Sequence, residues 1–108
     1  MKENPTYYAI IPANVRYDEN IPLGAKLMYG EITALSNKEG YCWASNNYFA
    51  SLYKVHSNTI QNWITALKKR GYIRLDTRQS QNGSKRKMFL IPQSQKFVIA
   101  QSQQAVIN

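Results

Sequence analysis

Between residues 45 and 71 the sequence holds two short helical patterns separated by a brief turn. Ser45 can cap the first pattern, because its hydroxyl can accept one of the backbone N–H groups that a helix leaves unpaired. Its apolar side is Phe49, Leu52 and Tyr53, and residues 54–56 are left for the turn. Ser57 can cap the second pattern, in which helical spacing relates Ile60, Trp63, Ile64 and Leu67 before Gly71 ends it. Two capped helices around a tight turn predict a helix-turn-helix motif.

A β-hairpin is predicted directly after this motif. Asn82-Gly83 is a dipeptide that type I′ turns prefer, so we place it at the tip. This register sets Leu75 opposite Leu90 and Thr77 opposite Met88. One face of the hairpin would then carry Ile73, Leu75, Met88 and Leu90. A hairpin that follows the second helix of such a motif is a wing.

The segment before the motif predicts a further helix and two short extended pieces. Residues 7–11 are aromatic and apolar, which indicates a short N-terminal strand or arm. A helix should begin near Pro22, with a buried stripe formed by Met28, Ile32 and Leu35, and by Leu23 and Leu27 beside them. Residues 40–43 indicate a brief strand.

These elements predict an α+β, mainly helical fold: a winged helix-turn-helix of three helices, a C-terminal hairpin and a short N-terminal strand. Residues 1–92 would form this domain, and the Gln- and Ser-rich residues 93–108 a linker or tail. Phe97, Val98 and Ile99 within the tail are alternatively a short docking element. The chain has 108 residues, enough for one modest core.

Charge is distributed very unevenly along the chain. Residues 1–53 carry four basic and five acidic side chains, whereas residues 54–87 carry nine basic side chains and only Asp76 as an acid. A strongly basic half predicts a surface that faces a polyanion such as nucleic acid. The alternative is a charged face that serves solubility only.

The exposed side of the second helix of the motif is the predicted base-reading surface. Each helical residue advances by about 100°, so the side opposite the apolar stripe is polar. Asparagine and glutamine can make paired hydrogen bonds to adenine in the major groove, and threonine can contact a thymine methyl. The candidate base contacts are Asn58, Gln61, Asn62 and Thr65.

Candidate contacts to the DNA backbone flank this surface. A helix N-terminus binds phosphate readily, and cationic side chains near its other end can reach the backbone. These candidates are Ser57, Lys68, Lys69 and Arg70, and on the wing Lys85, Arg86 and Lys87. We prefer Arg86 for a minor groove because narrow grooves attract guanidinium groups. The alternatives are an ordinary polar helix face and a hairpin kept soluble by charge.

Other functions find little support in the sequence. We expect no enzyme, because no nucleophile-base pair, phosphate-binding glycine loop or carboxylate pair is present, and no metal or cofactor site. His56 is expected to be exposed or to contact phosphate, and Trp43 and Trp63 to belong to the core. The single cysteine, the absence of a signal segment and the short apolar runs predict a cytoplasmic protein outside membranes.

Three segments carry a family resemblance: Ile21 to Leu27, Gly40 to Asn46, and Asn58 to Ile73. They resemble the winged helix-turn-helix domains at the N-termini of bacterial phage and plasmid replication initiators, including replisome-organiser proteins, over roughly residues 7–91. The resemblance implies that residues 57–70 enter the major groove and that the function is origin recognition. A departure is the asparagine-rich reading face, where relatives often carry Arg or Lys.

The resemblance also implies replication proteins as partners. Initiators of this type commonly have a longer C-terminal region for self-association or partner loading, which would attach at residues 93–108. Two alternatives remain open: a transcriptional regulator that binds a palindrome as a homodimer, and a winged helix that binds an acidic protein. The DNA site, the oligomeric state and whether the chain is a fragment are also left open.

Overall fold

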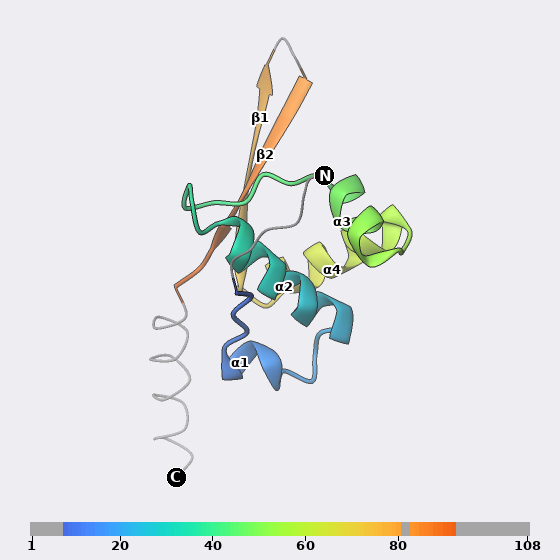
Figure 1. The fold of residues 1–108 in the computed structure, drawn as a ribbon, viewed down its shortest axis with the longest axis vertical. Helices are drawn as coiled ribbons and strands as arrows, with labels where there is room; N and C mark the ends of the chain where they lie inside the picture. Colours follow the sequence, from blue (N-terminus) through green and yellow to red (C-terminus); the bar gives the residue numbers. More distant parts are fainter. Residues whose placement is uncertain (1–7, 81–82, 93–108) are drawn as a thin grey trace.

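The computed structural model describes residues 8–80 and 83–92. Its elements are α1 (Ala13–Arg16), α2 (Leu23–Leu35), α3 (Asn46–Tyr53), α4 (Ser57–Lys69), β1 (Ile73–Ser80) and β2 (Gly83–Leu90). The helices gather into one body, and the hairpin of β1 and β2 projects from it (Figure 1). This architecture is a winged helix-turn-helix of the α+β class, with one helix more than the sequence predicted.

The core lies where α2, α3 and α4 meet the base of the hairpin. Fully buried side chains come from every one of these elements: Met28 and Ile32 of α2, Phe49 of α3, Ile60, Ile64 and Leu67 of α4, Ile73 of β1 and Met88 of β2. The apolar stripe predicted for α4 is therefore confirmed at three of its four positions. The fourth, Trp63, is only partly buried and packs at the edge of the core.

The packing of α4 on α2 depends on a missing side chain. The indole ring of Trp63 lies directly over Gly24, where an added Cβ atom would overlap the ring. Tyr53 packs edge-on against the same indole, with ring centroids 6.1 Å apart. Gly24 therefore sets how closely α4 approaches α2, and with it the placement of the predicted reading helix.

The turn between α3 and α4 is the short one that the sequence predicts. The Oγ of Ser45 accepts the Tyr48 N–H at 3.1 Å, which confirms the predicted cap of α3. Lys54 adopts a left-handed backbone with φ of 57° and ends α3. The cap of α4 is His56, whose Nδ1 accepts the Asn58 N–H at 3.1 Å, so the prediction of Ser57 was displaced by one residue.

The hairpin starts after Gly71, whose φ of 79° confirms the predicted left-handed end of α4. Its register differs from the prediction, because Leu75 pairs with Met88 rather than Leu90 and Gly83 pairs with Ser80 inside the ladder. Asn82 lies outside the described residues. The difference is an even number of residues, so the predicted apolar face survives.

The predicted strand at residues 40–43 is a single bridge. Cys42 and Met88 exchange two backbone hydrogen bonds of 2.9 and 2.7 Å. The segment around Cys42 therefore pairs with β2 on the side away from β1. Residues 8–12 form no strand, and Tyr7 lies outside the described residues. Residues 8–12 run instead along α2, where the Ile10 N–H donates a hydrogen bond to Thr33 Oγ1 at 2.9 Å.

The predicted stripe of α2 was wrong in its first turns. Ala25, Met28, Tyr29 and Ile32 are buried, whereas Leu23 and Leu27 are 77% and 57% exposed. Gly24 leaves room for the indole of Trp63, which lies directly over it, and Ala25 is fully buried. In residues 8–80 and 83–92, no helix is long and apolar enough to cross a membrane.

A buried carboxylate ties the segment after α1 to the end of α4. Asp18 accepts hydrogen bonds from the Tyr72 hydroxyl, from Arg70 Nε at 2.9 Å and from the Asn20 N–H at 2.8 Å. Burial alone would raise the pKa of Asp18, but the three donors outweigh it and lower the pKa below its usual value. Burial, and then this carboxylate, raises the pKa of Tyr72 to about 12.

Replacing Gly24 by alanine should destabilise the domain although alanine favours helices. The new methyl group overlaps the Trp63 ring, and overpacking of this kind costs about 1–3 kcal/mol in the free energy of unfolding. Thermal and urea unfolding of Gly24→Ala measure this cost. Leu23→Ala, at an exposed neighbouring position, is the control and should change stability by less than about 0.5 kcal/mol.

The same substitution in a Trp63→Phe background separates the clash from other effects. The smaller ring leaves room for the methyl group, so Gly24→Ala should cost clearly less there. Equal costs in both backgrounds would mean that the indole does not limit the approach of α2 and α4.

Asp18→Asn should lower stability by about 2 kcal/mol at neutral pH, because the charged acceptor of three hydrogen bonds is lost. Since folding lowers the pKa of Asp18, its contribution is complete above the unfolded pKa of about 4 and disappears as pH falls through the folded value. The variant should therefore lose less stability than the original chain upon acidification. Unfolding curves between neutral and acidic pH test this, and parallel pH profiles would contradict it.

Candidate nucleic-acid interface

The outer side of α4 is a continuous polar surface. Its helical phase follows from the buried stripe, which turns the opposite side chains to solvent. The structure exposes Asn58, Gln61, Asn62, Thr65 and Lys69, as the sequence predicted. A hollow of about 500 Å³ lies on this side, lined by Asn20, Asn62, Thr65, Ala66, Lys69 and Arg70. The surface thus offers amide and hydroxyl groups at its centre and cations at its C-terminal end.

Gln61 is held by neighbours on both sides. Its Oε1 accepts a hydrogen bond from Asn46 Nδ2 at 3.1 Å, and its Nε2 donates to Thr65 Oγ1 at 3.4 Å. Asn46 is the first residue of α3, so the two helices of the motif are linked by side chains as well as by packing. The amide of Gln61 is thereby oriented before any ligand binds.

Arg86 points inward and completes this chain of hydrogen bonds. Its Nη1 donates to Asn46 Oδ1 and its Nη2 to the Ala44 carbonyl, each at 2.7 Å. Burial lowers the pKa of the guanidinium, which nevertheless makes two short bonds. In the unbound chain the guanidinium thus braces the wing against the start of α3, and the minor-groove contact predicted for Arg86 stays a prediction.

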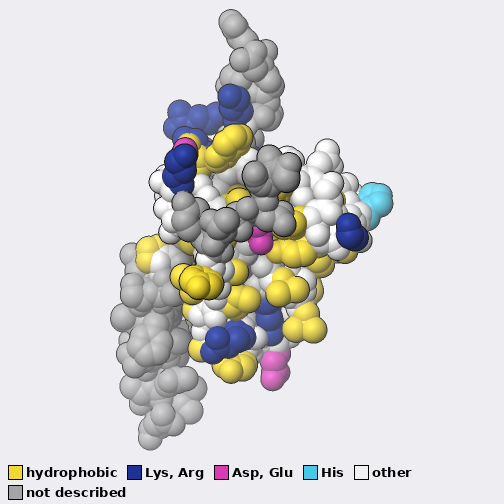
Figure 2. Space-filling model, in the orientation of Figure 1, with side chains coloured by type: hydrophobic (Ala, Val, Ile, Leu, Met, Phe, Trp, Pro, Cys, Tyr) yellow, Lys and Arg dark blue, Asp and Glu magenta, His cyan; other side chains and the backbone are white. Residues whose placement is uncertain are grey.

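The two lysines beside Arg86 lie on the other side of β2. Lys85 is exposed, and the Lys87 Nζ lies 4.5 Å from the centroid of the Tyr41 ring. Figure 2 shows Lys and Arg side chains gathered on the hairpin in this view, above a helical part with more hydrophobic surface. Lys85 is consequently the wing cation best placed to reach a phosphate.

The residues predicted to contact phosphate at the two ends of α4 differ in their exposure and in their partners. At the N-terminus Ser57 is half-buried, and the His56 imidazole already occupies the Asn58 N–H. At the C-terminus Lys68 and Lys69 are exposed, whereas Arg70 is 42% exposed and bound to Asp18. The lysines therefore supply solvent-exposed positive charge, and Arg70 adds a charge held by its bond to Asp18.

Sequence reasoning missed three features of this surface. Two of them are Asn46 and the inward course of Arg86, whose side chains bond to each other although they are 40 residues apart in the sequence, so no local pattern predicts this contact. Trp43 was expected in the core but is 69% exposed. Successive side chains in an extended segment point to opposite faces, so a buried Cys42 predicts that Trp43 points to solvent. The described residues contain no group of three or more His, Cys, Asp or Glu side chains arranged for a metal ion.

A family model described as a helix-turn-helix domain matches residues 19–73. The match covers half of the chain, from the segment before α2 to the first residue of β1. The chain belongs to this helix-turn-helix family. Comparisons with curated proteins and with solved structures gave no significant match.

Membership in the helix-turn-helix family supports double-stranded DNA as the partner. In such domains the second helix of the motif lies in the major groove, and its outward side chains meet the base edges. In this helix-turn-helix domain that helix is α4, whose outer side carries the amide-rich surface. The individual base and phosphate contacts named from the sequence stay predictions.

Lys85→Ala and Arg86→Ala should weaken DNA binding in different ways. Removing Lys85 should lower affinity for all duplexes alike and make the slope of log affinity against log salt shallower by about 1, because one phosphate contact is lost. Removing Arg86 should leave this slope unchanged but reduce discrimination between sequences, because Gln61 loses its support. Binding titrations at several salt concentrations measure both quantities.

Thermal unfolding of the two variants provides the control. Arg86→Ala should lower the melting temperature, since Asn46 and the Ala44 carbonyl lose a charged donor, whereas Lys85→Ala should not. A shallower salt slope for Arg86→Ala with an unchanged melting temperature would show that Arg86 leaves its inward position and contacts DNA directly.

Proposed function

We propose that this chain is a sequence-specific double-stranded-DNA-binding domain that recognises a replication origin of a phage or plasmid. The observation that carries DNA reading is the outer side of α4, where Gln61 is oriented by Asn46 and Thr65 beside the exposed Asn58 and Asn62. Uncharged amides of this kind discriminate bases, whereas lysines at the edges supply affinity. The proposed role is binding without catalysis, in the cytoplasm.

The origin-recognition part rests on the resemblance of the sequence to phage and plasmid replication initiators. Under this proposal, replication proteins are the partners, and the region that begins at residue 93 contacts them. The DNA-reading part stands independently, because it rests on α4 and on the helix-turn-helix match. Selection of bound sites from random duplexes, followed by a search for those sites in the origin of the encoding replicon, tests the two parts separately.

A transcriptional regulator is the second candidate, and one observation favours it. Leu23 and Leu27 lie one turn apart on α2 and are 77% and 57% exposed. An exposed apolar pair on a helix suits self-association, and a dimer would bind a palindromic site. Selected sites with two inverted half-sites, together with a dimer in analytical ultracentrifugation, would favour the regulator over the initiator.

Asn62→Ala should reduce specific binding while sparing nonspecific binding. Asn62 lies at the centre of the α4 surface, and losing a paired contact to one base should cost about 1–3 kcal/mol at the selected site. Preference should relax at one base position. The salt slope should not change, because asparagine carries no charge and releases no counterions. Titrations with the selected duplex and with a scrambled duplex measure this difference.

Asn37→Ala is the matched control, because Asn37 is an exposed asparagine after the end of α2. It should leave both affinities unchanged, and both variants should unfold within about 0.5 kcal/mol of the original chain. An equal loss of specific and nonspecific affinity in Asn62→Ala would make Asn62 a backbone contact. A sharp loss of stability would contradict its exposed position.

A further inference from the structure

The side of the hairpin that faces away from the helices carries alternating aromatic and cationic side chains. The apolar face of Leu75 and Met88 is turned to the core, so neighbouring residues along β1 and β2 point outward. The Cys42–Met88 bridge aligns residues 41–43 beside β2 and extends this outer face. Its aromatic and basic members are Tyr41, Trp43, Arg74, Arg78, Lys85, Lys87 and Phe89, and the acidic Asp76 lies opposite Lys87 on the same face.

Two of the three rings on this face already have partners. The Arg74 guanidinium carbon lies 4.3 Å from the centroid of the Phe89 ring, and Lys87 Nζ lies 4.5 Å from that of Tyr41. The rings of Tyr41 and Phe89 are 5.7 Å apart and tilted by 48°. Cations and rings thus form a packed ladder across the sheet.

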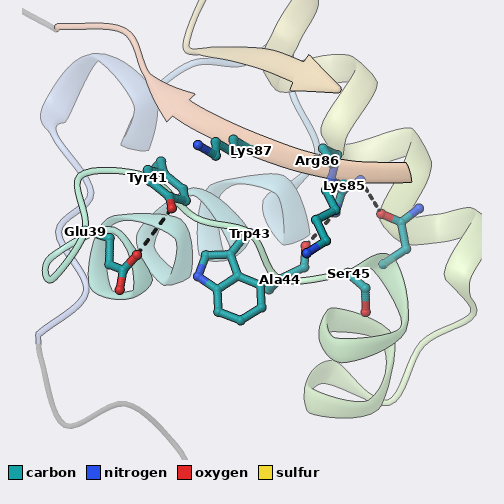
Figure 3. A pocket seen from close by; sticks show the side chains of 9 residues that line it. Glu39, Tyr41, Trp43, Ala44, Ser45, Lys85, Arg86 and Lys87 are labelled. Carbon is teal, nitrogen blue, oxygen red and sulfur yellow. Dashed lines mark hydrogen bonds between the residues drawn. The ribbon is translucent and has the colours of Figure 1, made fainter. Parts of the chain in front are cut away.

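Trp43 is the exception in this ladder. In the described part of the chain its ring has no aromatic or cationic partner, and 69% of the residue is exposed. It borders a hollow of about 720 Å³, into which Lys85 and Lys87 also extend (Figure 3). An indole face beside two ammonium groups is left open to solvent, with Glu39 as the acidic residue at the far edge of the hollow.

We propose that this outer face binds single-stranded nucleic acid, with an unpaired base stacked on Trp43 and the adjoining phosphates near Lys85 and Lys87. Bases within a duplex are stacked on their neighbours and present only their edges, so only an unpaired base offers a free ring face to the indole. Aromatic rings combined with cations are the common chemistry of single-strand recognition. The charge of the surface matches a polyanion, because its four cations Arg74, Arg78, Lys85 and Lys87 outnumber its two carboxylates, Asp76 and Glu39.

This site adjoins the start of α3 but not the outer side of α4, because the hollow beside Trp43 is lined by Asn46 and Arg86 and by no residue of α4. Trp43 and Lys87 project from one side of the sheet, whereas Arg86 between the lysines turns to the other side and joins Asn46. Lys85, near the free end of the hairpin, lies at the border of the two surfaces. The proposal does not depend on origin recognition.

The test is the affinity of the complete chain for a fluorescently labelled oligothymidine of about ten nucleotides, measured by anisotropy. Trp43→Ala should lower this affinity by about 5- to 150-fold, the effect of losing one stacked base. Trp43→Phe should retain most of the affinity, since a ring remains. Duplex affinity and melting temperature should stay unchanged, because Trp43 is exposed and lies away from α4.

Tyr17→Ala is the matched control. Tyr17 is 71% exposed and has the Arg16 guanidinium 4.8 Å from its ring centroid, but it lies beside α1, away from the hairpin. It should leave single-strand binding unchanged. Quenching of tryptophan emission upon addition of unlabelled oligothymidine, lost in Trp43→Phe, would report the stacking directly.

Three outcomes would overturn the proposal. The original chain could bind the duplex but not the oligothymidine, which would point to a protein partner for this face. Trp43→Ala could bind oligothymidine as tightly as the original chain, which would place the single strand elsewhere. Equal losses of single-strand and duplex affinity would make the outer face part of the duplex interface. Failure of duplex binding alone would concern the function proposed above and not this site.

Discussion

The contact between the Trp63 indole and Gly24 is the constraint on which the placement of α4 depends. A recognition helix must present its outer side at a fixed angle while its inner side is held rigidly. Here Ile60, Ile64 and Leu67 are buried in the core. At the edge of the core, the indole of Trp63 packs directly on the backbone of Gly24. Because ring and backbone meet without an intervening side chain, small changes at residue 24 should shift the whole reading surface.

A second set of contacts joins the wing to this framework. The guanidinium of Arg86 bonds to Asn46, and Asn46 in turn bonds to Gln61. The wing, the first helix of the motif and the second are thus connected by side chains that are far apart in the sequence. Such a chain orients the amide of Gln61, a predicted base contact, in the unbound domain, and preorganisation of this kind reduces the entropy lost on binding. Under the proposed function, Arg86 would support the DNA-binding surface from within the domain.

The sequence predicts most of the helix-turn-helix and less of what surrounds it. Strong helical spacing and clear end signals determined the phase of α4, so its exposed amides were found correctly. In α2 the abundant apolar residues fit more than one phase, and the space occupied by Trp63 decided between them. The inward course of Arg86 depends on a partner 40 residues away, and local charge patterns suggested the opposite direction. The hairpin register differed because a preferred turn dipeptide is only one contribution to strand pairing, beside the packing of Met88 in the core.

The most direct test of the central claim is NMR chemical-shift mapping of the isotope-labelled chain during titration with its selected duplex. The claim is that the outer side of α4 reads the duplex in a geometry set by the helix packing. The largest amide shifts should therefore fall at the exposed positions of α4, with smaller ones at Asn46 and along the wing. Shifts concentrated on the exposed Leu23 and Leu27 side of α2, with α4 unaffected, would contradict it.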